Sequence, residues 1–298
     1  MRIVLSAASG LIGSALAASL ASDGISVTRL VRRAPGAPGE VRWDPMVKAG
    51  DLDPAVLSGA DAVVHLSGAP VAGGRWTQAR KQVLRDSRII STTAITEAIA
   101  AAPQPPPALL CGSAIGWYGG TGDRPATESD PAGTGFLADL VRDWEAAANR
   151  AAQGGTRVVS LRSGIVLSRQ GGMLGPLLPL FRLGLGGRIG PGTQYLSWIA
   201  RTDEVRAIRF LLDHDEISGP VNLTAPEPVT NAEFTAALAA AVHRPAVLTV
   251  PAGMLRTALG EVSGELLGSN RVAPARLTDA GFAFRYPGIR AALAAELG

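Results

Sequence analysis

The sequence predicts an α/β fold, a doubly wound parallel sheet with a smaller C-terminal substrate lobe. Two observations predict it: short apolar runs alternate with helical segments over most of the chain, and a turn containing glycine follows the first apolar run. Strands that alternate with helices form parallel sheets covered by helices on both faces. We assign residues 1–224 to the sheet domain and residues 225–298 to the lobe, with residues 166–202 contributing to the cleft between them.

The elements of the sheet domain follow from the apolar pattern. Short apolar runs predict strands at Arg2–Ser6, Ile25–Val31, Val41–Trp43, Asp61–Ser67, Ala108–Ser113, Thr156–Arg162 and Val221–Thr224. Longer segments predict helices at Leu11–Ala21, Trp76–Ala101, Phe136–Ala152 and Asp203–Leu212. The prolines from Pro103 to Pro107 end the second helix, because proline cannot continue it.

The pattern changes after Val166. Residues 171–192 are rich in glycine and proline, and a short helix is expected near Leu177–Leu183. Residues 230–298 predict mostly short helices, with one strand near Val247–Val250. We expect these segments to form a lobe that closes over the carboxyl edge of the sheet.

The composition excludes several classes of protein. The chain has 298 residues, of which 47% are hydrophobic, so it can bury a large core. The net charge of +3 is small and the basic residues are dispersed, which argues against a nucleic-acid partner. Cys111 is the single cysteine, and no apolar stretch is long enough to span a bilayer. We expect a cytoplasmic protein with no membrane partner and, lacking Cys/His ligand spacings, no metal.

A glycine turn joins the first expected strand to the first expected helix. Glycines there let the backbone approach a pyrophosphate, which rests on the helix N-terminus. Gly13 permits close packing of helix on strand, whereas Ala7 stands where a three-glycine turn has its first glycine. This context predicts a Rossmann-type dinucleotide site; the alternative is an ordinary βα turn. The predicted contacts are Ser9, Gly10, Leu11, Ile12 and Gly13.

The end of the second strand indicates which dinucleotide binds. An acid there favours NAD, and an arginine accommodates the 2′-phosphate of NADP. The strand is followed by Arg32 and Arg33, without an acid. Guanidinium groups hold phosphate through charge-assisted hydrogen bonds. We therefore predict NADP as the cofactor; the alternative is a solvated basic turn.

An ordered series of short motifs extends along almost the whole chain. They are Val41–Pro45, Gly74–Thr77, Arg85–Arg88, Ser113–Gly119, Phe136–Ala138, Leu183–Gly187, Ser197–Ile199, Val229–Phe234 and Ala280–Phe282. Through them the chain resembles the extended type of the short-chain dehydrogenase/reductase superfamily. More closely, it resembles the atypical branch labelled NAD-dependent epimerase/dehydratase, which has its own small C-terminal domain. A homodimer through exposed helices is expected only by analogy with this superfamily.

The resemblance implies further cofactor contacts. Asp44 would meet the adenine amino group, and Ser113 would lie near the nicotinamide. Each position has a structural alternative; Asp44, for example, could cap a turn. The remaining implied contacts are Leu66, Ser67 and Gly68 beside the phosphates and ribose, and Ser163, Gly164 and Ile165 beside the nicotinamide.

The usual catalytic pair of the superfamily is missing. That pair is a tyrosine acting as acid/base and a lysine four residues later that lowers the tyrosine pKa. The matching positions are Leu137 and Val141. Ser113 would polarise the substrate oxygen. Tyr118 is the candidate substitute acid/base, and packing beneath its loop is the alternative.

Arg88 takes the place of an asparagine that supports a proton relay in the superfamily. It would bring positive charge near the ribose or substrate, or else pair on the helix surface with Glu97 or Asp86. Glu145 is assigned a structural role on its helix. The family's usual charged cleft positions are uncharged here, at Ala69, Ala200 and Thr202.

A polar and aromatic wall could bind the substrate, with solvated surface as the alternative. Its candidates are Trp117, Arg182, Arg188, Tyr195, Trp198 and Arg201. The leading hypothesis is an NADP-dependent oxidoreductase or epimerase-like enzyme acting on a small polar molecule. The alternatives are an NADP-binding regulator or redox sensor without turnover, and a non-redox isomerase or cyclase on the same fold.

Overall fold

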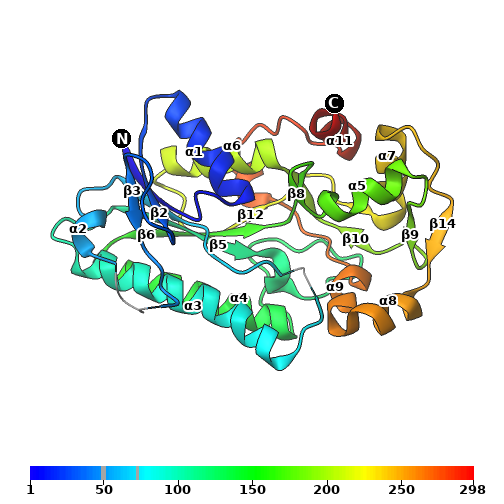
Figure 1. Cartoon of the computed structure of the whole chain (residues 1–298), viewed down its shortest axis with the longest axis horizontal. Helices are drawn as coiled ribbons and strands as arrows, with labels where there is room; N and C mark the ends of the chain where they lie inside the picture. The colour runs from blue at the N-terminus through cyan, green and yellow to red at the C-terminus, as the bar shows by residue number, and fades with distance from the viewer. Residues whose placement is uncertain (48–51, 72–73) are drawn as a thin grey trace.

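The centre of the protein is a seven-stranded parallel sheet in the order β12-β6-β5-β4-β1-β2-β3. The computed structural model describes residues 1–47, 52–71 and 74–298 (Figure 1). The strands are β1 Arg2–Ser6, β2 Ser26–Val31, β3 Glu40–Arg42, β4 Ala62–His65, β5 Ala108–Ala114, β6 Arg157–Ser163 and β12 Gly219–Leu223. This sheet confirms the predicted fold class. The strand order reverses between β1 and β4, where doubly wound sheets bind their ligands.

Helices cover both faces of the sheet (Figure 1). On one face lie α1 (Leu11–Ser22) and α6 (Arg201–Asp213), and on the other α3 (Gln78–Ala101) and α4 (Phe136–Asn149). The short helix α2 (Pro54–Leu57) precedes β4.

Each face of the sheet has its own apolar core, because successive strand residues point to opposite sides. Ile3 and Leu5 of β1 pack in one core with Leu16 of α1. Val4 packs in the other core with Ile95 of α3. The helices are thus held mainly by burial of apolar surface.

The ends of the helices differ slightly from the prediction. Helix α3 begins at Gln78 rather than Trp76 because the Thr77 hydroxyl caps it, accepting a hydrogen bond of 3.2 Å from the Arg80 amide. Helix α4 ends at Asn149 and continues as the 3-10 helix η2 (Arg150–Gly154).

Beyond β6, the chain forms small sheets. The strands β11 (Trp198–Ala200), β7 (Ile165–Ser168) and β8 (Gly171–Gly172) form one sheet, β10 (Tyr195–Leu196) pairs with β13 (Val229–Thr230), and β9 (Gly187–Ile189) pairs with β14 (Leu248–Val250). Of these strands, β14 confirms the one expected near Val247–Val250, and the others were not predicted. The remaining helices are η1 Ile115–Tyr118, α5 Leu174–Arg182, α7 Asn231–Ala241, α8 Ala252–Leu259, η3 Gly260–Val262, α9 Ser263–Leu267, α10 Ala275–Asp279 and α11 Ile289–Leu297.

Polar contacts join the C-terminal lobe to the sheet domain. Lys81 of α3 forms an ion pair with Glu261 of η3. The Arg75 guanidinium donates to the backbone carbonyls of Thr257 and Ala258 in α8. Within the described ranges, no helix has both the length and the apolar character needed to cross a membrane.

Candidate functional site

The turn between β1 and α1 is open to solvent at its tip, where Ser9 and Gly10 are exposed. Gly10 is the N-cap of α1, and no side chain caps this end of the helix. The amides of the first turn therefore present donors and the positive end of the helix dipole to an anion. Gly13 is buried, and a Cβ there would lie 2.3 Å from the Ala7 carbonyl oxygen. The turn therefore depends on glycine at this position.

Ala7 adopts the left-handed conformation, with φ of 53°. This is the position where a three-glycine turn has its first glycine, and an alanine pays a steric cost there. The carbonyl of Ala7 accepts a hydrogen bond of 2.9 Å from the Gly10 amide, which closes the turn.

The two arginines after β2 have different surroundings. Arg33 forms a bidentate pair with Glu40 of β3, at 2.8 and 2.6 Å. Its hydrogen bonds, together with that of the Gly36 amide, lower the pKa of Glu40 to about 2. Arg32 is exposed, and its side chain forms no ion pair or hydrogen bond with any described residue. Arg33 is therefore already paired, because β3 supplies the acid that is absent after β2, whereas Arg32 has no such partner among the described residues.

The carboxyl ends of β1 and β4 are tied together by the Ser6 hydroxyl. It accepts hydrogen bonds from the Leu66 amide and the Ser67 hydroxyl, each 3.0 Å long, and lies 2.9 Å from Nδ1 of His65. Burial lowers the pKa of His65 to about 3, so this histidine is a neutral core residue. These hydrogen bonds fix the segment Leu66–Gly68 where the strand order reverses between β1 and β4. Gly68 itself is exposed.

Asp44 caps a turn in this structure, which is the alternative to the expected contact with adenine. Its Oδ1 accepts a hydrogen bond of 3.2 Å from the Met46 amide and so caps the turn after β3.

Arg88 is buried beneath the segment that follows β4, so its interpretation as a surface residue paired with Glu97 or Asp86 is wrong. Its guanidinium donates to the Leu84 carbonyl at 3.1 Å and the Ala69 carbonyl at 3.0 Å. Burial lowers its pKa to about 10, which leaves it charged at neutral pH. A Cβ at Gly68 would lie 3.1 Å from the Arg88 Cζ, so the arginine supports this segment from below.

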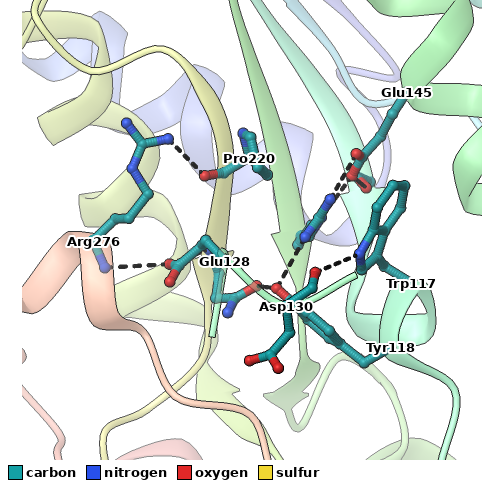
Figure 2. Close-up of polar contacts among 10 residues, drawn as sticks. Trp117, Tyr118, Glu128, Asp130, Glu145, Pro220 and Arg276 are labelled. Atoms are coloured by element: carbon teal, nitrogen blue, oxygen red, sulfur yellow. Dashed lines mark hydrogen bonds and ion pairs between the residues drawn. The ribbon is translucent and has the colours of Figure 1, made fainter. Parts of the chain in front are cut away.

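Glu145, Tyr118 and Trp117 belong to one buried network (Figure 2), which also includes Ser113 near the end of β5. The Ser113 hydroxyl donates to Oε1 of Glu145 at 2.6 Å. Arg162 of β6 holds the same carboxylate through Nε at 2.8 Å and Nη2 at 2.9 Å. Arg162 is 2% exposed, so its charge depends on this pair. The structural role expected for Glu145 thus extends beyond its helix, because the carboxylate connects α4 to both strands.

Tyr118 belongs to the same network. Its hydroxyl accepts a hydrogen bond of 3.0 Å from Arg162 and donates one of 2.7 Å to Asn222 Oδ1. Burial raises the pKa of Tyr118, although Arg162 opposes this shift. A phenol with both hydrogen bonds satisfied and a raised pKa is a poor acid/base at neutral pH. The structure thus argues against the catalytic role expected for Tyr118 and favours the packing alternative.

Trp117 forms one wall of this network. The Arg162 guanidinium lies 4.0 Å from its ring centroid, and its indole nitrogen donates to the Asp130 carbonyl at 3.2 Å (Figure 2). The network continues to the lobe through Glu128, whose Oε1 accepts from the backbone amides of Asn222 and Arg276. Trp117 therefore supports Arg162 in this conformation.

A second buried carboxyl lies at the end of β6. Ser163 donates to Oε1 of Glu204 at 2.6 Å, and Oε2 of Glu204 has no hydrogen-bond partner. Burial raises the pKa of Glu204 to about 8. Gly164, next to Ser163, has no room for a side chain, since a Cβ would lie 2.7 Å from the Ser197 carbonyl oxygen. Ile165 is half-buried.

The expected substrate wall does not form as one surface. Trp198 is 1% exposed and donates to the Glu227 carbonyl at 3.0 Å, so it is a core residue and its assignment was wrong. Three of the other side chains contact neighbours of their own: Tyr195 lies under Arg271, Arg188 donates to Thr249, and Arg201 donates to Gln170. Arg182 is exposed, and only its backbone carbonyl accepts a hydrogen bond, from Arg244.

A hollow of about 100 Å³ lies beside Leu137, the position matched to the missing catalytic tyrosine. It is lined by Gly116, Gly119, Gly120, Thr134, Gly135, Phe136, Leu137, Ala138, Gly264, Gly268 and Asn270. Leu137, Val141 and Glu145 follow at intervals of four residues and so share one face of α4. In the described part of the chain, no three metal-ligating side chains come together.

No feature of the sequence indicated Arg162 or Glu204, and the structural role expected for Glu145 did not include its partners Ser113 and Arg162. The four-residue spacing from Leu137 through Val141 was a signal for Glu145, because it places the carboxyl on the helix face that meets β5. No comparable signal marks Arg162, since only the packing of α4 against β5 and β6 shows which side chains it meets.

The reversal of strand order between β1 and β4, the uncapped start of α1, and Ser113 near the end of β5 define a dinucleotide-binding protein of the short-chain dehydrogenase/reductase type. The chain belongs to the NAD dependent epimerase/dehydratase family, whose model matches residues 3–224. A domain of unknown function, DUF1731, matches residues 250–296. These matches confirm the predicted family.

The relatives share nearly the whole chain. An epimerase family protein of Mycobacterium tuberculosis is 49% identical over 98% of this chain and 96% of its own length. Epimerase family protein SDR39U1 of Homo sapiens is 36% identical over 98% of both chains.

Two solved structures have a closely similar fold. The crystal structure of human SDR39U1 with NADPH has a TM-score of 0.92 and 34% identity, covering 100% of this chain and 99% of that chain. The nucleoside-diphosphate sugar epimerase from Corynebacterium glutamicum has a TM-score of 0.82 and 36% identity, covering 100% of this chain and 58% of that chain.

Proposed function

We propose that the protein binds NADP and acts as an oxidoreductase or epimerase-like enzyme on a small polar substrate. The uncapped amides at the start of α1 would hold the pyrophosphate, and Arg32 would hold the 2′-phosphate. Arg33, kept in place by Glu40, would add positive charge nearby. The structure of human SDR39U1 with NADPH supports this choice of cofactor.

The observation that carries the catalytic part is the 2.6 Å hydrogen bond from Ser113 to Glu145. Because the serine proton points to the carboxylate, the lone pairs of its oxygen remain for a substrate hydroxyl. In oxidation, Ser113 accepts the substrate hydroxyl proton while passing its own to Glu145; in reduction, the two transfers reverse. The cofactor, when bound, accepts or supplies the hydride. Arg162 keeps Glu145 in position throughout.

The test is the reduction of small aldehydes and ketones, followed by NADPH absorbance. We expect Ser113→Ala to lower turnover by about 100-fold or more while leaving NADPH affinity unchanged. Ser22→Ala, at the exposed end of α1, is the matched control and should behave as wild type. Full turnover in Ser113→Ala would refute the role of this serine.

The second candidate is an NADP-binding regulator without turnover. It is favoured by the apolar side chains Leu137 and Val141 at the positions of the catalytic pair, and by the engaged hydroxyl of Tyr118. Tight NADPH binding by the wild type, with no carbonyl compound reduced, would support this candidate over the first.

A further inference from the structure

The hollow beside Leu137 lies between the two parts of the molecule. The segments around η1 and the start of α4 provide eight of its eleven lining residues, and the segment that includes α9 provides Gly264, Gly268 and Asn270. Six of the eleven are glycines, and no described lining residue carries a charge. Such a wall is made largely of backbone groups and short apolar surface.

The hollow depends on glycines, which have no side chain to fill it. A Cβ at Gly116 would lie 3.2 Å from Cβ of Leu137, and Gly119 has φ of 60° with the Thr134 carbonyl oxygen 3.1 Å from its Cβ position. A volume of about 100 Å³ equals that of roughly three water molecules in the liquid. A compact ligand of a few carbons fits this space, whereas a nucleoside diphosphate sugar is several times larger.

Asn270 is one of two lining residues with a polar side chain, the other being Thr134. The backbone of Asn270 is fixed on both sides: its amide donates to the Tyr195 carbonyl at 3.1 Å, and its carbonyl accepts from the Ser197 hydroxyl at 2.8 Å. Its side-chain oxygen is buried and has no hydrogen-bond partner. A buried amide oxygen left unpaired costs free energy, which a ligand hydroxyl or N–H group would recover.

The cations around this region are already engaged. Lys81 pairs with Glu261, Arg75 donates to carbonyls of α8, and Arg271 donates to the Asp123 carbonyl at 3.0 Å. These basic groups hold neighbouring segments together. A phosphate or diphosphate entering the hollow would lose hydration without gaining a charged partner.

We propose that this hollow is the substrate subsite, and that it selects a compact, uncharged hydroxy or carbonyl compound through the carboxamide of Asn270 while rejecting phosphorylated substrates and nucleotide sugars. This inference rests on the proposed function and narrows its substrate class. It separates this chain from the nucleotide-sugar chemistry named for its Corynebacterium neighbour.

The test compares neutral compounds with their phosphates on the full chain saturated with NADPH. The probes are dihydroxyacetone and its phosphate, glycerol and glycerol 3-phosphate, and UDP-glucose, with binding followed by saturation-transfer NMR. We expect each neutral compound to bind at least about tenfold more tightly than its phosphate, and UDP-glucose not to bind. Equal or tighter binding of a phosphate or of UDP-glucose, or no binding of either neutral compound, would overturn the inference.

A variant tests the role of Asn270. Asn270→Leu should weaken binding of the neutral compounds by about tenfold and leave NADPH affinity unchanged. Asn149→Leu, at the exposed end of α4, is the matched control and should change neither. Unchanged binding in Asn270→Leu would overturn the assignment. If the wild type does not bind NADPH, the proposed function is refuted instead. Failure of the proposed function is therefore distinguishable from failure of the Asn270 assignment.

Discussion

The two halves of the carboxyl edge of the sheet are built in opposite ways. At β1, consecutive residues from Ser6 to Gly13 form the turn, and its shape depends on backbone conformation and the absence of side chains. At β5 and β6, Ser113, Glu145 and Arg162 come from three separate elements and depend on a buried charge pair. The turn after β1 should therefore be destabilised by added side-chain atoms. The network at β5 and β6 should be destabilised by removal of a charge.

The largest expected effect is the loss of charge at Glu145. Glu145→Gln leaves Arg162 buried without its partner and should lower the free energy of unfolding by about 3–5 kcal/mol. Asp143→Asn on the same helix is the matched control, because its pair with Arg85 is solvent-exposed and should contribute less than about 1 kcal/mol. Urea unfolding measures both variants. Equal losses would show that burial does not distinguish the two pairs.

The corresponding test of the turn adds one methyl group. Gly13→Ala places a Cβ against the Ala7 carbonyl, and we expect it to destabilise the protein by about 3 kcal/mol and to weaken NADPH binding. Gly175→Ala in α5 is the control: no atom lies within 4 Å of its added Cβ, so stability should be unchanged or slightly raised. Thermal unfolding and fluorescence titration with NADPH check both. A stable, NADPH-binding Gly13→Ala would contradict the steric argument.

The pH dependence of stability tests the second buried carboxyl of the β6 half. The pKa of Glu204 is raised from 4.5 to about 8 in the folded protein, so folding favours its protonated form. Its contribution is full below pH 4.5 and is lost as the pH rises to about 8. Between pH 6 and pH 8.5 the wild type should therefore lose about 2 kcal/mol more than Glu204→Gln, measured by urea unfolding. Parallel pH profiles would refute the raised pKa.

The smallest expected effect is a gain in stability at the turn. Ala7→Gly relieves the left-handed conformation of an alanine, and the greater freedom of glycine in the unfolded chain offsets part of this gain. We expect a net stabilisation of about 0.5–1 kcal/mol, seen as a higher Tm. A lower Tm would mean that the alanine methyl makes packing contacts that outweigh its strain.

Most of the fold follows from local patterns in the sequence. The seven strands of the main sheet and its four long helices correspond to apolar runs of the expected lengths. The boundaries shift where a single side chain decides them, as Thr77 does for α3. Except for β14, the strands of the small sheets were not predicted, because strands of two to four residues outside the regular strand–helix alternation give only a weak signal.

In the candidate site, too, local features could be predicted and contacts between distant residues could not. The glycine turn could be predicted because all its parts are adjacent in the sequence. The partners of Ser113 could not, since Glu145 lies 32 residues away and nothing local links the two. Glu40 was missed for a related reason: the acid that meets Arg33 comes from the next strand, seven residues later. Trp198 was expected in a substrate wall, but its short strand is buried along its whole length, which the sequence around it does not show.

The Glu145 carboxylate receives three hydrogen bonds, one from the serine and two from the guanidinium. Folding therefore relies mainly on the Glu145–Arg162 ion pair, whereas the serine adds a single charge-assisted hydrogen bond. A replacement at position 113 would remove that one hydrogen bond and leave the Glu145–Arg162 pair in place. The reaction proposed for Ser113 could therefore be lost without loss of the fold.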